Sequence, residues 1–253
     1  YANIRPTYTF DSPLEKSPIK KSIIQGTDLV FVRELTGGIY FGKRGRNKTD
    51  DYAYDTCEYN VNEIKRLAKI GFELAMKRSK KLCCIDKANV LETSRLWRQT
   101  VQSLEKNYPE VNVSYEFVDA VAMRLIHSPS YYDVLITSNL FGDILTDEAS
   151  VISGSMGLMP SASVGVETSI YEPIHGSFPQ AKGKNIANPL ATILSASMMF
   201  ERSFHLNEES KLIRDLVNES ISNNIVTKDL SGDGKPFTTT EVGDWIVDRI
   251  RKG

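Results

Sequence analysis

The sequence lacks the features that mark secreted, membrane-spanning or polyanion-binding proteins. It contains no secretory signal segment, no long apolar run, and no internal repeat or low-complexity tract. Its 31 basic residues are balanced by 32 acidic ones, for a net charge of −1. Because no basic excess is available to neutralise phosphates, a nucleic-acid or membrane binder is not favoured. Small molecules and other proteins remain as the expected partners.

Cysteine is also scarce, with three residues that show no paired spacing. Cys83 and Cys84 lie inside the apolar run Leu82–Ile85, and Cys57 stands apart. This pattern favours buried structural thiols in a reducing compartment over a metal or redox site. We therefore expect a cytoplasmic protein, or one of an organelle matrix if a transit peptide has been removed. The first position is not methionine and its segment is typical of an element already under way, so we expect residues before it in the intact protein.

The chain does contain enough apolar sequence for a sizeable core. With 41% hydrophobic and 25% charged residues over 253 positions, it fits one large or two modest domains. Predicted strands and helices alternate, which indicates an α/β fold with helices flanking a sheet. The predicted strands are Asp28–Glu34, Lys81–Asp86, Val111–Val118 and Asp133–Thr137, and the predicted helices begin at Asn60, with a capping box to Glu63, and at Thr93. The charged run Lys43–Asp51 predicts a solvated loop, with polyanion binding as the minor alternative.

The second half is predicted to be helical around one irregular segment. Residues Ile170–Pro189 are punctuated by glycine and proline, which predicts a loop. Asn188 and Pro189 are the expected N-cap and first residue of an apolar helix that reaches Phe200. Two further helices are expected, one from Glu208 to Asn223 and one capped by Thr238 and Glu241.

Two acidic residues, Asp143 and Asp147, are the strongest candidates for chemistry. They belong to Ser138–Gly157, which follows a predicted strand and predicts a glycine turn and a helix start. Residues four apart share one helix face, with Cβ atoms about 5–6 Å from each other. Two carboxylates held that close repel unless a proton or cation lies between them, and oxygen ligands suit Mg²⁺ or Mn²⁺. The alternative is two first-turn acids favoured by the helix dipole, and spacing alone leaves both interpretations open.

Arg5, Arg33 and Tyr40 are further candidates. Each arginine ends a strand-like run, where a guanidinium can bind a carboxylate through two hydrogen bonds. Tyr40 follows the glycine pair Gly37–Gly38 and can line a cleft. Taken singly, a surface salt bridge for each arginine and a half-buried strand position for Tyr40 are the simpler interpretations.

Lys87, Asn89 and Asp119 form a second group of candidates. Lys87 and Asn89 are two apart, so in an extended segment their side chains point the same way. A lysine there can be a general base if burial or neighbouring cations lower its pKa, and Asp119 can add a third carboxylate to a metal site. The alternatives are a solvated lysine and a helix N-cap at Asp119.

Five motifs together resemble the isocitrate/isopropylmalate dehydrogenase family. They are Arg33–Gly42, Asp86–Leu91, Val118–Ala120, Ser138–Gly157, and Glu172–Ser177 with Gly183–Pro189. The resemblance covers the chain without a large gap, and Leu35–Gly38 is similar to the isopropylmalate branch. It implies the family's two-domain α/β fold, with residues 1–153 as the substrate-binding and dimerisation domain and residues 154–253 as the C-terminal half of the cofactor-binding domain. Part of the first domain is expected before Tyr1, which leaves that domain incomplete in this chain.

The resemblance also implies a role for each candidate in substrate binding, proton transfer or metal binding. The implied sets are Arg5, Arg33, Asn89, Val90 and Asp119 for substrate, Tyr40 and Lys87 for proton transfer, and Asp119, Asp143 and Asp147 for Mg²⁺ or Mn²⁺. Lys87 is expected to help remove a hydroxyl proton and Tyr40 to return a proton to an enolate. Because Lys87 and Asp119 reach the other subunit's site in the family, a homodimer with shared active sites is implied.

The loop His175–Asn188 is similar to the family's adenosine-binding loop for NAD. The implied NAD ligands are Glu172, His175, Gly176, Ser177, Phe178, Gln180, Ala181 and Asn188. Gln180 stands where NAD-using members commonly carry an acidic residue, and Phe178 where the residue is often small. Glutamine can hydrogen-bond a ribose hydroxyl but does not repel a 2′-phosphate, so NAD is expected and NADP is less excluded than usual.

The implied function is metal-dependent oxidative decarboxylation of (2R,3S)-3-isopropylmalate to 4-methyl-2-oxopentanoate and CO₂, with reduction of NAD, in leucine biosynthesis. A metal on the new carbonyl would be the Lewis acid that stabilises the enolate left by loss of CO₂. Two alternatives remain open: a related enzyme acting on tartrate, malate or homoisocitrate, and an inactive dimerising fragment. The side chains that select the substrate are expected before Tyr1.

Overall fold

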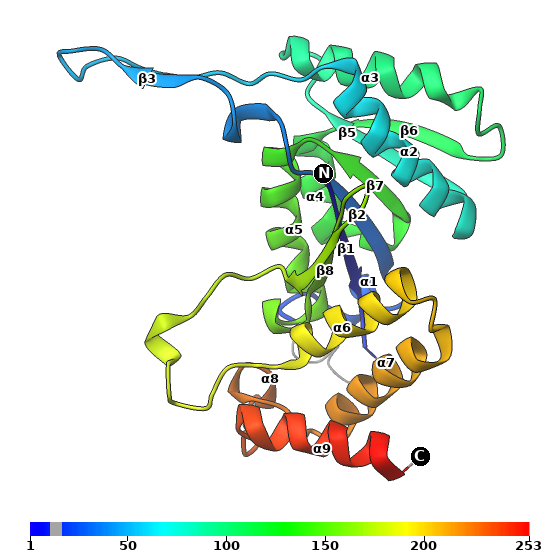
Figure 1. Cartoon of the computed structure of the whole chain (residues 1–253), viewed down its shortest axis with the longest axis vertical. Coiled ribbons are helices and arrows are strands. Elements are labelled where there is room, and N and C mark those ends of the chain that lie inside the picture. The colour runs from blue at the N-terminus through cyan, green and yellow to red at the C-terminus, as the bar shows by residue number, and fades with distance from the viewer. Residues whose placement is uncertain (11–16, 253) are drawn as a thin grey trace. The chain divides into compact units, whose positions relative to one another are not determined.

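The computed structural model describes residues 1–10 and 17–252, which form an α/β structure (Figure 1). The strands are β1 (Ala2–Tyr8), β2 (Asp28–Glu34), β3 (Arg44–Arg46), β4 (Ala53–Asp55), β5 (Lys81–Asp86), β6 (Asn112–Phe117), β7 (Val134–Thr137), β8 (Pro160–Val164) and β9 (Ser169–Pro173). The α-helices are α1 (Lys21–Ile24), α2 (Val61–Lys77), α3 (Glu92–Glu105), α4 (Val118–His127), α5 (Asn139–Ser153), α6 (Leu190–Ser203), α7 (Asn207–Ser222), α8 (Lys228–Ser231) and α9 (Thr239–Lys252). Short 3₁₀ helices are η2 (Gly38–Tyr40), η3 (Pro129–Tyr131), η4 (Met156–Leu158) and η5 (Pro179–Ala181).

The chain divides into two compact units. Unit 1 comprises Tyr1–Ile4 and Leu29–Glu148, and unit 2 comprises Arg5–Asp28 and Ala149–Gly253. The main sheet has the strand order β6-β5-β7-β2-β1-β8-β9, and β3 pairs with β4. The predicted α/β class with helices flanking a sheet is confirmed, while the domains proposed for residues 1–153 and 154–253 stay a prediction. Among the described residues, no helix is both long and apolar enough to cross a membrane.

Unit 1 is built on parallel strands. β2 and β5 both pair with β7, β6 pairs with β5, and all of these pairs are parallel. Their carboxyl ends therefore meet at one edge of the sheet, where ligands bind in open α/β folds. In the core of unit 1, α2 and α3 pack on the strands, and the buried residues there include Phe72, Trp97 and Ile136. The predicted capping box of α2 is confirmed, since Asn60 and Glu63 exchange side-chain and backbone hydrogen bonds.

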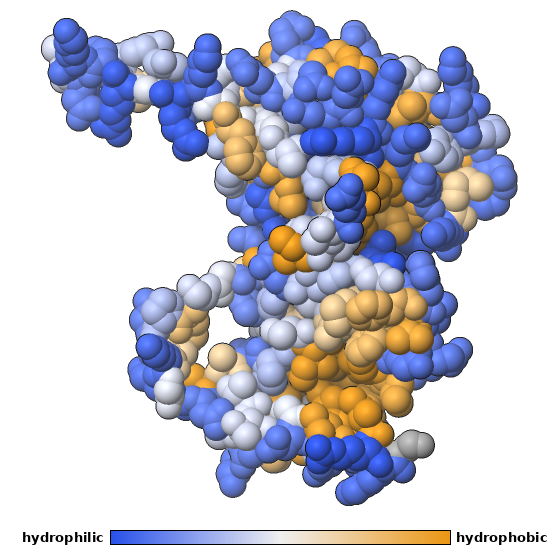
Figure 2. Space-filling view, viewed as in Figure 1, coloured by the Kyte–Doolittle hydropathy of each residue, from blue (hydrophilic) through white to orange (hydrophobic). Residues whose placement is uncertain are grey.

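Other local predictions for unit 1 need correction. The helix predicted from Thr93 begins one residue earlier, and no side-chain cap is present at its start. The predicted loop Lys43–Asp51 contains β3, which pairs with β4 in an exposed hairpin, and Figure 2 shows mainly hydrophilic surface there. Cys83 and Cys84 are buried as predicted, but Cys57 is exposed because it lies on the segment after this hairpin.

Unit 2 pairs an antiparallel β8–β9 hairpin with helices α6, α7 and α9. Its core includes Leu194, Val217, Val242 and Ile246. The predicted cap of α9 is confirmed, because Thr238 and Glu241 hydrogen-bond each other's backbone and side chain. The start predicted for α6 is one residue too early: Pro189 is the N-cap, while the Asn188 side chain accepts from Leu190 N at 2.9 Å. Figure 2 shows hydrophobic surface in the region of α6 to α9.

Candidate active site

Arg33 is the buried centre of the candidate site in unit 1. It pairs in register with Thr137 across the parallel β2–β7 ladder, so α5 begins beside it. Its Nε and Nη2 donate to Asn139 Oδ1 at 3.2 and 2.8 Å, and its Nη1 donates to Asp143 Oδ1. A charged guanidinium with three directed donors forms a rigid contact. Arg33 thus connects a predicted carboxylate-binding position to a predicted metal ligand.

Gly142 allows this close approach, and it is not the turn residue that the sequence predicted. It lies inside α5, where a Cβ would come 2.7 Å from Arg33 Cγ and 2.8 Å from Thr137 Cγ2. Both separations are too short for a carbon pair, so a side chain at this position would displace Arg33 or the helix. The glycine is therefore required by packing.

Tyr40 joins Arg33 and Asp143 in a three-residue contact. It ends η2, which Gly38 begins at a φ of +75°, and it lies in neither a strand nor a half-buried position, being 39% exposed. Its hydroxyl donates to Asp143 Oδ2 at 2.5 Å, and the Arg33 guanidinium lies 5.6 Å from its ring centroid. The hydrogen bond to Asp143 and, secondarily, partial burial raise the pKa of Tyr40. The phenol is a neutral, solvent-accessible acid, as a proton donor must be.

Asp147 follows Asp143 by one helical turn and is exposed. The first turn of α5 contains no acidic residue, so the interpretation of both aspartates as first-turn acids is wrong. Two carboxylates on one face fit a hard cation such as Mg²⁺ or Mn²⁺, which takes oxygen ligands. Within residues 1–10 and 17–252, no three His, Cys, Asp or Glu side chains group as a cation site. A full coordination shell would thus need ligands beyond this pair.

Lys87 and Asp119 form an ion pair at the carboxyl ends of β5 and β6. Lys87 Nζ lies 2.6 Å from Asp119 Oδ1 and 5.4 Å from the Phe117 ring centroid. The hydrogen bond from Lys87 lowers the pKa of Asp119. Asp119 is not the N-cap of α4, because Phe117 occupies that position.

The segment after Lys87 turns instead of running extended. Val90 N donates to Lys87 O at 3.0 Å, so the expected common direction of Lys87 and Asn89 does not follow from an extended chain. Asn89 and Val90 are both exposed. Next to this turn lies a contact that no sequence pattern predicted: the buried Asp86 carboxylate accepts hydrogen bonds from Arg98 Nε and Nη2 at 2.7 and 3.0 Å.

Arg5 and the predicted NAD loop belong to unit 2. Arg5 is 7% exposed on β1. Figure 1 shows the segment between β9 and α6 extending away from the helices of its unit. Most of the predicted NAD ligands are exposed or half-buried, namely Glu172, His175, Gly176, Ser177, Phe178, Gln180 and Asn188, whereas Ala181 is buried.

One glycine of this loop has open space beside its backbone, and the end of the loop is hydrogen-bonded. A Cβ added at Gly176 meets no described atom within 4 Å, which leaves space beside the backbone for a ligand. Asn188 is fixed at the other end, since its Nδ2 donates to Asp229 Oδ2 at 2.9 Å and its side chain packs on Gly157. The loop is thus open at Gly176 and anchored at Asn188.

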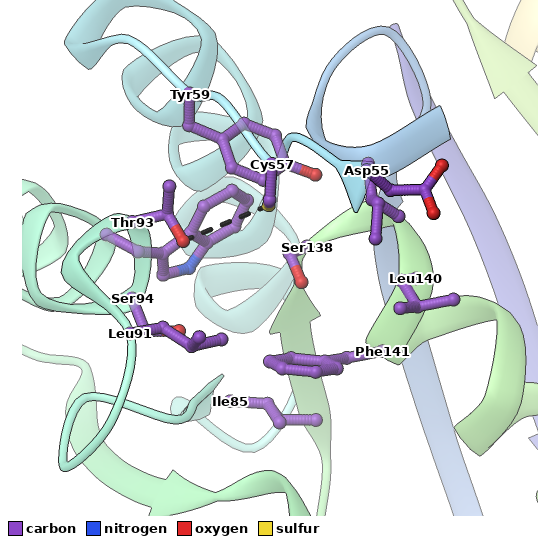
Figure 3. A pocket seen from close by; sticks show the side chains of 12 residues that line it. Asp55, Cys57, Tyr59, Ile85, Leu91, Thr93, Ser94, Ser138, Leu140 and Phe141 are labelled. Carbon is purple, nitrogen blue, oxygen red and sulfur yellow. Dashed lines mark hydrogen bonds between the residues drawn. The ribbon is translucent and has the colours of Figure 1, made fainter. Parts of the chain in front are cut away.

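A cavity of about 250 Å³ lies behind the start of α5 (Figure 3). Tyr59 and Cys57 lie on one side of it, and Ile85 and Phe141 on the other. Tyr59 packs edge-on against Trp97, with ring centroids 5.3 Å apart, and burial raises its pKa. Sequence reasoning missed Tyr59, because an isolated tyrosine before a helix cap carries no distinguishing pattern.

The matches to known proteins extend over nearly all of the chain. Residues 1–246 match the isocitrate/isopropylmalate dehydrogenase family. The chain therefore belongs to the isocitrate/isopropylmalate dehydrogenase family, a family of dehydrogenases, and the resemblance seen in the motifs is confirmed.

Curated relatives and solved structures agree with this assignment. The 3-isopropylmalate dehydrogenase of Bacteroides fragilis is 54% identical over 253 residues, which cover 100% of this chain and 71% of that enzyme. The 3-isopropylmalate dehydrogenase of Clostridium acetobutylicum is 50% identical over 252 residues, covering 98% of this chain and 71% of that enzyme. A crystal structure of isocitrate dehydrogenase from Methylococcus capsulatus has a TM-score of 0.89 at 33% identity, covering 99% of this chain and 73% of that one.

Proposed function

We propose that the protein containing this chain is an NAD-dependent 3-isopropylmalate dehydrogenase of leucine biosynthesis. It converts (2R,3S)-3-isopropylmalate to 4-methyl-2-oxopentanoate and CO₂. The observation that carries the proposal is the contact among Arg33, Asp143 and Tyr40. It supports the proposal because the family resemblance assigns these three side chains to carboxylate binding, metal binding and proton donation. Relatives that bear this enzyme's name at 50% identity or more, over nearly the whole chain, support the same substrate.

The proposed chemistry divides among these side chains. Arg33, oriented by Asn139, binds a substrate carboxylate, and Arg5 binds another. Bound Mg²⁺ or Mn²⁺ supplies Lewis-acid stabilisation of the developing negative charge on oxygen. Asp143 and Asp147 hold that ion, and Tyr40 returns a proton to the enolate carbon with its neutral phenol.

The ion pair of Lys87 and Asp119 supports a homodimer with shared sites. In this chain, the two residues bind each other rather than joining Asp143 and Asp147 in a cation cluster of described residues. We assign them to the site of a second subunit, where Lys87 helps to take the hydroxyl proton and Asp119 adds a metal ligand. Asn89 and Val90, exposed on the same turn, reach the same substrate.

NAD is the proposed cofactor, bound by the loop from His175 to Asn188 with Glu172, and the proposed compartment is the cytoplasm. Gln180 can accept or donate a hydrogen bond to a ribose hydroxyl. We also propose that residues 1–153 form the substrate-binding and dimerisation domain and that residues 154–253 form the C-terminal half of the cofactor-binding domain.

Steady-state kinetics on the intact protein test the function. With Mn²⁺ and NAD, 3-isopropylmalate should give NADH with a higher kcat/KM than tartrate, malate or homoisocitrate, and chelation by EDTA should stop the reaction until Mn²⁺ is restored. Absence of nicotinamide reduction on 3-isopropylmalate contradicts the proposal. A preference for another 2-hydroxy acid would reassign the substrate.

A further inference from the structure

Tyr59 lies between the two segments that carry the candidate site. Its hydroxyl oxygen accepts a hydrogen bond from Asn139 N at 2.9 Å. Asn139 is the first residue of α5, and the first N–H groups of a helix have no partner within the helix. The phenol therefore satisfies one such group and fixes the position where α5 begins. The side chain of the same Asn139 orients Arg33, and Asp143 follows one turn later.

The ring of Tyr59 also supports the turn that leads to Tyr40. A Cβ at Gly38 would come 2.3 Å from the Tyr59 hydroxyl oxygen, and one at Gly37 would come 2.8 Å from its ring. The two glycines thus pack directly on the tyrosine. Gly38 N donates to Glu58 O at 3.0 Å, and Asn139 Nδ2 donates to Gly37 O at 3.3 Å. These bonds join the turn to the segment before α2 and to the start of α5.

The ring of Tyr59 also packs against the core of unit 1. Trp97, 1% exposed in the unit 1 core, contacts it edge-on at an interplanar angle of 76°. A well-packed aromatic ring with a hydrogen-bonded hydroxyl has little freedom to move. Tyr59 is therefore a fixed reference point between the core and the two segments.

We propose that Tyr59 is a positioning residue for the group formed by Arg33, Asp143 and Tyr40. It acts through Asn139 and through the Gly37–Gly38 turn, setting the distance between the helix that carries Asp143 and the 3₁₀ helix that carries Tyr40. The proposal rests on the proposed function for the roles of those three side chains. The contacts of Tyr59 with Asn139 and with the Gly37–Gly38 turn do not depend on that function.

The test compares Tyr59→Phe with Tyr132→Phe in the intact protein. Both substitutions keep the ring and remove one hydroxyl. The Tyr132 hydroxyl donates to the Glu116 carboxylate at 2.9 Å in the same unit, and a hydrogen bond to a charged group contributes at least as much stability as one between neutral groups, so Tyr132→Phe is a stringent control for lost stability. Tyr59→Phe should lower kcat about tenfold, the equivalent of one lost hydrogen bond, and weaken Mn²⁺ binding by a similar factor. Tyr132→Phe should leave both quantities within about twofold. Mn²⁺ affinity is measured by calorimetry without substrate.

The outcomes are distinguishable. If Tyr59→Phe keeps wild-type kcat and Mn²⁺ affinity, or if Tyr132→Phe shows the same losses, the positioning role is wrong. If the wild-type protein does not oxidise 3-isopropylmalate, the proposed function fails. The Mn²⁺ affinities of the two variants still decide the role of Tyr59, since they require no turnover.

Discussion

Lys87 Nζ and Asp119 Oδ1 lie 2.6 Å apart, although 32 residues separate them in the sequence. The pair lies at the ends of β5 and β6, with Lys87 25% exposed and Asp119 66% exposed. Both groups are therefore presented to solvent, where a second subunit can meet them.

Mixed dimers should reveal whether this pair serves another subunit. Lys87→Met and Asp143→Asn are each expected to be nearly inactive alone. When the two variants are unfolded together and refolded, half of the dimers contain one complete site each, so about a quarter of wild-type activity should return. Recovery is measured as NADH formation against each variant refolded alone. No recovery would mean that Lys87 and Asp143 act within one chain.

Metal binding should depend on Asp147 and not on its neighbour. Asp147→Asn removes a proposed charged oxygen ligand and should weaken Mn²⁺ binding by at least about tenfold. Glu148→Gln is the matched control, because Glu148 lies on a different helix face from Asp143 and should leave the affinity unchanged. Calorimetry of both variants gives the comparison. Equal weakening would place the cation elsewhere on α5.

Gly142 should be less tolerant of alanine than another helical glycine. In Gly142→Ala the new Cβ collides with Arg33 Cγ at 2.7 Å, and overpacking of this kind costs about 1–3 kcal/mol and should reduce kcat/KM. Gly243→Ala in α9 meets no described atom within 4 Å and should stabilise the protein by about 0.5–1 kcal/mol. Urea unfolding and steady-state kinetics measure both. Full activity of Gly142→Ala would rule out the packing explanation.

The buried ion pair of Arg98 and Asp86 should contribute more to the free energy of unfolding than an exposed ion pair does. Arg98→Met leaves the fully buried Asp86 carboxylate without its two guanidinium contacts, which should cost about 3 kcal/mol. Lys211→Met breaks the exposed pair with Asp215 and should lower the urea midpoint much less, because water and salt screen an exposed ion pair. Urea midpoints compare the two variants. Similar losses would mean that Arg98 contributes little beyond a surface charge.

The three thiols of this chain should react at different rates. Burial raises the pKa of Cys83 to about 12 and that of Cys84 well above its usual value, so neither forms thiolate near neutral pH. Cys57 is exposed and should react with dithionitrobenzoate in the native protein. A Cys57→Ser variant should lose that fast phase, and Cys83 and Cys84 should react only after unfolding. A fast phase that survives in Cys57→Ser and disappears in Cys83→Ser would contradict the burial order.

Short-range patterns in the sequence were sufficient for much of the fold. The strands Asp28–Glu34 and Lys81–Asp86 were predicted with their observed bounds, because each is an apolar run bounded by charge. The capping boxes of α2 and α9 were also predicted, since each joins residues three apart. The predicted starts of α3 and α6 were each displaced by one residue, and the N-cap residue of neither helix makes a side-chain capping hydrogen bond.

The sequence named the candidate site residues, which stay a prediction, but not their contacts. Asp143 and Asp147 were proposed from their spacing and from the family motif, and Arg33 and Tyr40 were favoured only through the family motifs. Their actual partners could not be read from local sequence, because the Tyr40–Asp143 and Arg33–Asn139 bonds join residues 103 and 106 positions apart. The same holds for Tyr59, which is 80 positions from Asn139.

The sequence by itself therefore determined the α/β class, the family and the acidic residues that suit a divalent cation, since these follow from periodicity and residue order. Only the tertiary structure decided that Gly142 is a packing residue for Arg33, that Lys87 binds Asp119, and that Tyr59 supports α5. The physical reason is the parallel sheet of unit 1, which brings the carboxyl ends of distant strands to one edge. Contacts at that edge are set by strand order and register, which local spacing does not encode.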